Sequence, residues 1–263
     1  MSGQQMAGRH ALITGGGAGI GREAALLFAR EGAAVAVADL NLAAAEESAA
    51  AITAGGGKAV ALQVDVAQAE SVEAMMAAAE AGLGCVDALF NNAGVMLSED
   101  RGPEDTGLAV WDRTIAINLT GVFHCCRFGI PALRRAGGGA ILNMSSLVAM
   151  MGSAVPQLAY TASKGGVMAM TREIAVQYGR QGIRCNALLP GPIGTPLTAE
   201  LFDTEEKLER RRVHMPLGRF GEAGEVASVA CFLCSEAASY VTGAGWLVDG
   251  GITAAYVTAE DPA

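Results

Sequence analysis

A tyrosine and a lysine four residues apart, Tyr160 and Lys164, are the pair best suited to do chemistry in this sequence. Residues with this spacing share one face of a helix, so the phenol and the ammonium can lie side by side. A free tyrosine has a pKa of about 10, and a neighbouring cation favours its phenolate. Such a pair could exchange a proton with an alcohol or carbonyl oxygen, although an ordinary pair on a helix surface would have the same spacing.

Two serines and an asparagine could complete that site. Ser145 and Ser146 follow an apolar run at 140–144, and either hydroxyl could hydrogen-bond the same substrate oxygen as Tyr160. Asn118 lies within a helix expected over 111–134, where asparagine is a poor helix former. A buried, hydrogen-bonded amide would explain Asn118 equally well on its own.

A glycine cluster, Gly15 to Gly21, follows the first apolar run and opens the next helical pattern. Glycines there permit a tight turn and a close approach to a pyrophosphate, and the helix N-terminus offers free N–H groups. The alternative is a plain turn. Asp39, at the end of the second run, could accept hydrogen bonds from an adenosine ribose and would repel a 2′-phosphate, which favours NAD(H) over NADP(H). A helix cap is the competing explanation for Asp39.

The remaining pattern indicates the fold that must position these residues. Apolar runs at 10–14, 33–38, 59–64, 86–90, 140–144, 183–188 and 246–248 alternate with helical patterns at 20–30, 42–53, 71–81, 111–134, 160–178 and 222–235. Strands separated by helices form parallel sheets through right-handed crossovers. We therefore expect an α/β fold, a doubly wound Rossmann-type seven-stranded parallel sheet with helices on both faces, in a single domain over 1–263.

Composition excludes several classes of function. The 263 residues carry a net charge of −9 and no extended basic run, which argues against a nucleic-acid partner. Every long apolar stretch is interrupted before it could span a bilayer, and no apolar signal segment is visible, so we expect a cytoplasmic protein. The three histidines show no metal-ligand spacing, and the CxxC of Cys231 and Cys234 lies in a helical pattern without a second ligand pair, so we expect no metal. Cys231 and Cys234 are interpreted as small buried residues.

The set of motifs resembles the short-chain dehydrogenase/reductase family, of the compact single-domain type. The matching pieces, which cover nearly the whole chain, are the glycine loop 14–21, Asp39, the segment 91–94, Asn118, Ser145 and Ser146, Tyr160 and Lys164, Pro190, Gly191 and Thr195, and the segment 248–251. The resemblance implies a hydride transfer between NAD(H) and a secondary alcohol or ketone, and a homotetramer.

The resemblance also implies roles for individual residues. Tyr160 would be the general acid or base, and Lys164 would bind the nicotinamide ribose and lower the pKa of Tyr160. Ser146 would orient the substrate oxygen, and Asn118 would hold a water that links Lys164 to solvent. The cofactor would contact Gly15, Gly17, Ala18, Gly19, Ile20, Gly21, Asp39, Leu40, Asp65, Val66, Asn92, Ala93, Gly94, Tyr160, Lys164, Pro190, Gly191, Ile193 and Thr195. We also expect Asn91 to shape the cavity floor, or else to tie down its own loop.

Two segments depart from the family pattern. Ser146 precedes Tyr160 by fourteen residues, where the family usually has about thirteen, so Ser145 stays an alternative. The acidic segment 97–108 could line the mouth of the pocket or be a solvated loop.

The substrate end is expected to be apolar. A helical pattern at 196–212 lies within a predicted substrate lid at about 196–220. Leu197, Leu201, Phe202, Val213 and Met215, with Leu147, Val148, Met150 and Met151, could form a pocket for a neutral, largely apolar substrate. Arg210 to Arg212 could be an exposed helix face or a carboxylate clamp. Two other functions fit less well: an NADPH-dependent 3-oxoacyl thioester reductase, and an NAD-binding regulator without turnover.

Overall fold

A seven-stranded parallel sheet forms the centre of the computed structural model, which describes residues 4–153, 155–199 and 204–255. In spatial order the strands are β3 (Lys58–Gln63), β2 (Ala34–Asp39), β1 (His10–Thr14), β4 (Ala88–Asn91), β5 (Gly139–Met144), β6 (Ile183–Pro190) and β9 (Gly245–Val248). The inner strands are apolar because both of their faces are covered. The predicted Rossmann-type fold is confirmed.

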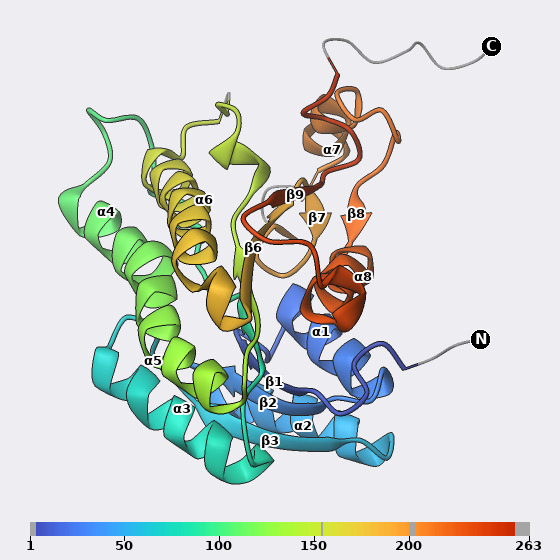
Figure 1. Ribbon diagram of the computed structural model, residues 1–263. Coiled ribbons are helices and arrows are strands. Elements are labelled where there is room, and N and C mark those ends of the chain that lie inside the picture. Colours follow the sequence, from blue (N-terminus) through green and yellow to red (C-terminus); the bar gives the residue numbers. More distant parts are fainter. Residues whose placement is uncertain (1–3, 154, 200–203, 256–263) are drawn as a thin grey trace.

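Three helices cover each face of the sheet (Figure 1). On one face α1 (Gly19–Arg30), α2 (Leu42–Ala54) and α8 (Ala223–Cys234) pack around Phe28 and Ile52. On the other face α3 (Ala69–Leu83), α5 (Gly121–Arg135) and α6 (Leu158–Tyr178) pack around Leu133 and Val167. Cys231 and Cys234 are buried in the first of these cores, as interpreted from the sequence. The strand order reverses between β1 and β4, and the carboxyl ends of the strands open there into a crevice.

The helix expected over 111–134 is longer and is interrupted. It consists of α4 (Leu108–Ile115), one π-helical stretch (Ala116–Thr120) and α5. Asn118 lies within the π-helical stretch, and such stretches are frequent at functional sites because they widen the helix locally.

The helix predicted over 196–212 is wrong at its N-terminal end. Residues 196–198 form a turn, and α7 spans only Glu205–Arg212, where the Thr204 hydroxyl accepts a hydrogen bond from the backbone N–H of Lys207. The turn is stabilised by the Thr198 side chain, which bonds the Ile193 carbonyl and the Thr195 backbone. Sequence reasoning also missed two short paired strands, β7 (Ile193–Gly194) and β8 (Gly221–Glu222), at the base of this segment.

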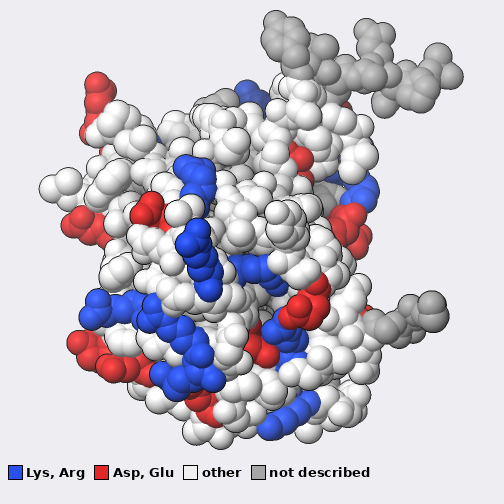
Figure 2. Space-filling model, viewed as in Figure 1, with Lys and Arg blue, Asp and Glu red and all other residues white. Residues whose placement is uncertain are grey.

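Charges are mixed on the surface. On the face shown in Figure 2, basic and acidic side chains lie beside one another over the lower part of the molecule. Of the helices in the described ranges, none is long and apolar enough to cross a membrane. In the same ranges, no group of three potential metal ligands of the His, Cys, Asp or Glu type comes together.

Candidate active site

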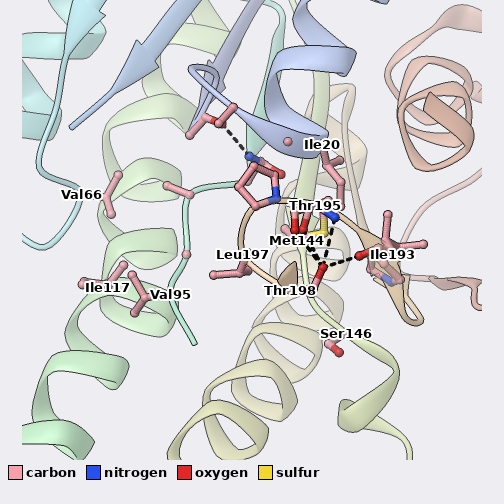
Figure 3. Close-up of a pocket in the computed structure, with 18 of the residues that line it drawn as sticks. Ile20, Val66, Val95, Ile117, Met144, Ser146, Ile193, Thr195, Leu197 and Thr198 are labelled. Atoms are coloured by element: carbon pink, nitrogen blue, oxygen red, sulfur yellow. Dashed lines mark hydrogen bonds between the residues drawn. The ribbon is translucent and has the colours of Figure 1, made fainter. Parts of the chain in front are cut away.

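A cavity of about 400 Å³ lies at the carboxyl ends of the central strands (Figure 3). It brings together most of the residues predicted from the sequence: Gly15, Ala18, Gly19, Ile20, Asp39, Leu40, Asp65, Val66, Asn92, Ala93, Gly94, Ser146, Tyr160, Lys164, Pro190, Gly191, Ile193 and Thr195. Gly17, Gly21 and Asn118 are outside its lining. The cavity therefore runs from the glycine loop at one end to the tyrosine and lysine at the other.

Gly17 and Gly21 support the glycine loop from behind. The backbone N–H of Gly17 donates to Asp39 Oδ2 at 2.9 Å. A side chain on Gly21 would place its Cβ 2.0 Å from the carbonyl oxygen of Gly15, so only glycine permits this packing. Gly15 itself has a φ of +66°. The first turn of α1 has no side-chain cap, so its N–H groups face the cavity end as donors for a pyrophosphate.

The far end of the cavity from Tyr160 carries negative charge. Asp39 Oδ1 accepts from the backbone N–H of Asn41 at 3.0 Å, which together with the Gly17 bond fixes the carboxylate. Leu40, beside it, is exposed and apolar. Lys164 is the only cation among the described lining residues, and it lies at the opposite end.

Three asparagines near the end of β4 make hydrogen bonds within the protein around the cavity wall. Of Asn91, Asn92 and Asn118, only Asn92 lines the cavity. The Asn91 amide is buried and donates to Asn143 Oδ1 at 2.8 Å, so Asn91 is tied into the core and is not among the residues that line the cavity. Asn92 lines the cavity, and its amide donates to the carbonyls of Thr14 and Gly15. The side chain of Asn118 accepts from the N–H of Val95 and donates to its carbonyl, both at 2.8 Å.

Both candidate serines line the cavity, but their hydroxyl groups have different partners. The Ser145 hydroxyl is buried and donates to the carbonyl of Lys164 at 2.8 Å, which occupies its proton in tying β5 to α6. The Ser146 hydroxyl lies in the cavity and hydrogen-bonds the Tyr160 side chain. The geometry therefore favours Ser146 as the residue that meets a substrate oxygen.

Burial raises the pKa of Tyr160, and the hydrogen bond with Ser146 opposes this rise. The Lys164 ammonium lies 5.4 Å from the centre of the Tyr160 ring and donates to the carbonyl of Met144 at 2.9 Å. Burial therefore dominates in the protein alone, and a lowering of the Tyr160 pKa by Lys164 together with a positively charged nicotinamide stays a prediction.

Gly94 keeps space open between Lys164 and the π-helical stretch. A Cβ at this position would lie 3.2 Å from Asn118 Oδ1 and 3.5 Å from Lys164 Nζ. The absence of a side chain therefore leaves the Asn118 carbonyl and the Lys164 ammonium as two polar groups facing a common gap. A water in that gap, as the family resemblance implies, stays a prediction.

Lys164 is buried at a cost to stability. Loss of hydration lowers its pKa to about 8, from 10.5. Below pH 8 Lys164 is charged in both states, and the folded protein carries the full cost of burying the ammonium. This cost fades between pH 8 and 10.5, where the folded lysine is neutral and the unfolded chain gives up its proton more easily as the pH rises. We expect Lys164→Met to raise the free energy of unfolding by about 1–3 kcal/mol at pH 7, with most of the gain lost at pH 10.

Urea unfolding of both proteins at pH 7 and pH 10 checks this. Lys58→Met, at an exposed lysine that begins β3, is the control and should show no such pH dependence. An equal effect of Lys164→Met at both pH values would contradict the burial of a charged ammonium.

Sequence reasoning missed two polar residues near the site. Thr198 lines the cavity, and its hydroxyl lies 3.1 Å from that of Thr195. Asp100 is buried, and its carboxylate accepts from the backbone N–H groups of Ala159 and Tyr160. The signal for Asp100 was indirect: Gln157, which precedes α6, gives its helix no side-chain cap, so another segment had to supply one.

The expected apolar pocket is only partly assembled. Leu197 lines the cavity, near Val95 and Ile117 (Figure 3). Val148 and Met215 are buried in the protein interior. Met150 and Met151, which follow Ser146 along the chain, are exposed. Leu201 and Phe202 lie outside the described residues. Arg210 and Arg212 are exposed, and Arg212 pairs with Glu209, as an exposed helix face predicts.

Comparison with known proteins gives consistent matches along the chain. Residues 15–253 match the family model described as enoyl-(acyl carrier protein) reductase. Cyclohexanol dehydrogenase of Acinetobacter sp. (strain SE19) is 42% identical over 244 residues, which are 92% of this chain and 94% of that protein. Cis-4-hydroxycyclohexanecarboxylate dehydrogenase of Sinomonas cyclohexanicum is 41% identical over 254 residues, covering 96% of this chain and 99% of the relative. The crystal structure of a short-chain type dehydrogenase/reductase from Mycobacterium marinum matches with a TM-score of 0.91 and 33% identity, covering 97% and 99% of the two chains.

Proposed function

Because the chain belongs to the short-chain dehydrogenase/reductase family, and so is an oxidoreductase that acts on secondary alcohols or ketones with a nicotinamide cofactor, we propose that it is an NAD(H)-dependent dehydrogenase of neutral, largely apolar secondary alcohols. One observation carries the proposal: a single cavity has Ser146, Tyr160 and Lys164 at one end and Asp39 at the other. Two relatives named for cyclohexane-ring alcohols make six-membered alicyclic alcohols the first substrates to test.

The chemistry of the proposal is shared between the cofactor and three side chains. A bound nicotinamide accepts or supplies the hydride. In alcohol oxidation the Tyr160 phenolate takes the proton from the alcohol, and in ketone reduction the Tyr160 hydroxyl gives its proton to the ketone oxygen. The Ser146 hydroxyl, which bonds Tyr160, orients that same oxygen, and the Lys164 ammonium adds positive charge beside the phenol. Asn118 acts through the Val95 backbone and the gap beside Gly94.

The cofactor site extends along the rest of the cavity. The glycine loop and the first turn of α1 would hold the pyrophosphate, and Asp39 would hold the adenosine ribose. Asp65 and Val66 would flank the adenine, while Ile193 and Thr195 would contact the nicotinamide. The donors, the carboxylate and the elongated cavity all fit such a molecule.

The proposal also includes the domain organisation, the location and the oligomeric state of the protein. Residues 1–263 would act as one nucleotide-binding domain, and the segment 196–220 would close over the substrate. The protein would work in the cytoplasm as a homotetramer that buries the last strand, β9, where Leu247 is exposed in the single chain.

A substrate panel tests the proposal. With NAD at alkaline pH, we expect cyclohexanol and other neutral secondary alcohols to be oxidised at least tenfold more efficiently, by kcat/KM, than sugars or small carboxylic hydroxy acids. The apolar lining residues Val95, Ile117 and Leu197 are the reason. Turnover confined to sugars or acids would refute the substrate class.

Two other results would change the function itself. A preference for NADPH with a 3-oxoacyl thioester would support the acyl-reductase alternative, since the matching family is described by an acyl carrier protein reductase. Binding of NAD without turnover of any alcohol or ketone would identify a regulatory protein instead.

A further inference from the structure

The first turn of the helix that carries Tyr160 is capped from a distant loop. The backbone N–H groups of Leu158, Ala159 and Tyr160 have no partner within α6, as at any helix N-terminus. Leu158 donates to the carbonyl of Arg101 at 3.2 Å. Ala159 donates to Asp100 Oδ1 at 3.0 Å, and Tyr160 donates to Asp100 Oδ2 at 2.8 Å. One carboxylate therefore binds the main chain of the tyrosine and of the residue before it.

Among the described residues, no basic side chain forms an ion pair with Asp100. The residue is 1% exposed. Its oxygens accept from the two helix N–H groups, and the Thr106 hydroxyl lies 3.4 Å from Oδ1. A carboxylate buried in this way is stable only while those donors stay in place, and the positive end of α6 adds to their effect. The loop and the helix therefore fix each other.

The loop around Asp100 is itself braced. The Thr106 hydroxyl accepts from the backbone N–H of Arg101 at 2.9 Å and donates to the carbonyl of Gly102 at 2.9 Å. In Figure 1 the connection that leads into α4 passes beside the start of α6. The Asp100 carboxylate is thus held on a closed turn, at a distance from the cavity lining.

We propose that Asp100 is a positioning residue for the reaction, which holds the Tyr160 backbone so that the phenol stays in register with Ser146 and Lys164. The inference rests on the proposed function. It follows from the two carboxylate bonds, because a shift of the first turn of α6 moves the Tyr160 hydroxyl relative to Ser146, which lies on another segment, two residues after the end of β5. Small displacements of a catalytic group cost large factors in rate.

Two variants at this position and one nearby test the proposal. Asp100→Ala removes both acceptors, Asp100→Asn keeps one, and Asp105→Asn changes an exposed carboxylate in the same loop. We would measure kcat and KM for an alcohol, Kd for NADH, and Tm, with all assays run well below the lowest Tm.

We expect Asp100→Ala to lower kcat at least twentyfold while KM and the NADH Kd stay within threefold of native. Asp100→Asn should recover part of that loss, and Asp105→Asn should match the native enzyme. A cap that only stabilised the fold would lower Tm without this selective loss of kcat.

Native kcat in folded Asp100→Ala would overturn the inference and leave the proposed function intact. If Asp100→Ala does not fold, Asp100→Asn decides: a fivefold or greater loss of kcat at native KM supports positioning, and native kcat overturns it. Absence of turnover in the native enzyme would instead refute the proposed function.

Discussion

Replacing Tyr160 with phenylalanine is expected to lower kcat for alcohol oxidation by about three orders of magnitude, equivalent to about 4 kcal/mol of transition-state stabilisation. The ring would stay in place, packed on α6 beneath the Lys164 ammonium. Only the hydroxyl that bonds Ser146 would be lost. Steady-state kinetics gives kcat, and titration with NADH should give a Kd within about threefold of native.

Tyr178→Phe is the matched control, since it makes the same change on the same helix. Tyr178 packs against Arg134 and does not line the cavity. Its variant should keep native kcat. If Tyr160→Phe also kept full turnover, the proton transfer proposed here would be wrong, even though the fold is that of the family.

The second large effect concerns the choice of cofactor. The native enzyme should favour NAD over NADP at least a hundredfold in kcat/KM, because a 2′-phosphate would meet the Asp39 carboxylate with only Leu40 beside it. Repulsion between unit charges at about 4 Å is about 4 kcal/mol at an effective dielectric of about 20. A hundredfold preference uses only about 2.7 kcal/mol of that, which leaves a margin for the partial exposure of Asp39.

The double variant Asp39→Ala with Leu40→Arg should reverse the preference for NAD over NADP. It removes the carboxylate that repels the 2′-phosphate and adds a guanidinium that can bind this phosphate. We expect the NAD/NADP ratio of kcat/KM to change by at least a thousandfold. Asp65→Asn is the control, because Asp65 lines the same cavity near the expected adenine. Its ratio should change less than fivefold. A native preference for NADP would contradict the role of Asp39.

The sheet could be predicted because strands that are buried on both faces appear in the sequence as short apolar runs. Six helices and seven apolar runs alternate along the chain, and each run became a strand within about two residues of its expected bounds. The segment after Thr195 could not be predicted in the same way. Its turn is made by the Thr198 hydroxyl and by a two-residue pairing of β7 with β8, and neither is visible in a periodic pattern.

The candidate site was predictable where residue type alone suggests a chemistry. Asp39, Tyr160 and Lys164 carry charges or protons that few structural roles require, and they do line one cavity. Contacts between segments that are far apart in the sequence could not be predicted from residue type. Asp100 binds the Tyr160 backbone across 60 residues of sequence. Ser145 differs from Ser146 because its hydroxyl donates to the Lys164 carbonyl, a contact that residue type does not reveal. The pKa of Tyr160 also depends on packing, which no spacing reveals.

The strand order has a consequence for how the chain is made. β1 pairs with β2 on one side but with β4 on the other, where Ala11 meets Ala88. A chain emerging from the ribosome can therefore join β1, β2 and β3, yet it presents an open, apolar β1 edge until β4 follows, about 25 residues after the end of β3. Unpaired edges of this kind recruit other strands. The β1 edge is thus open to aggregation at this stage of biosynthesis, and the arrival of β4 covers it.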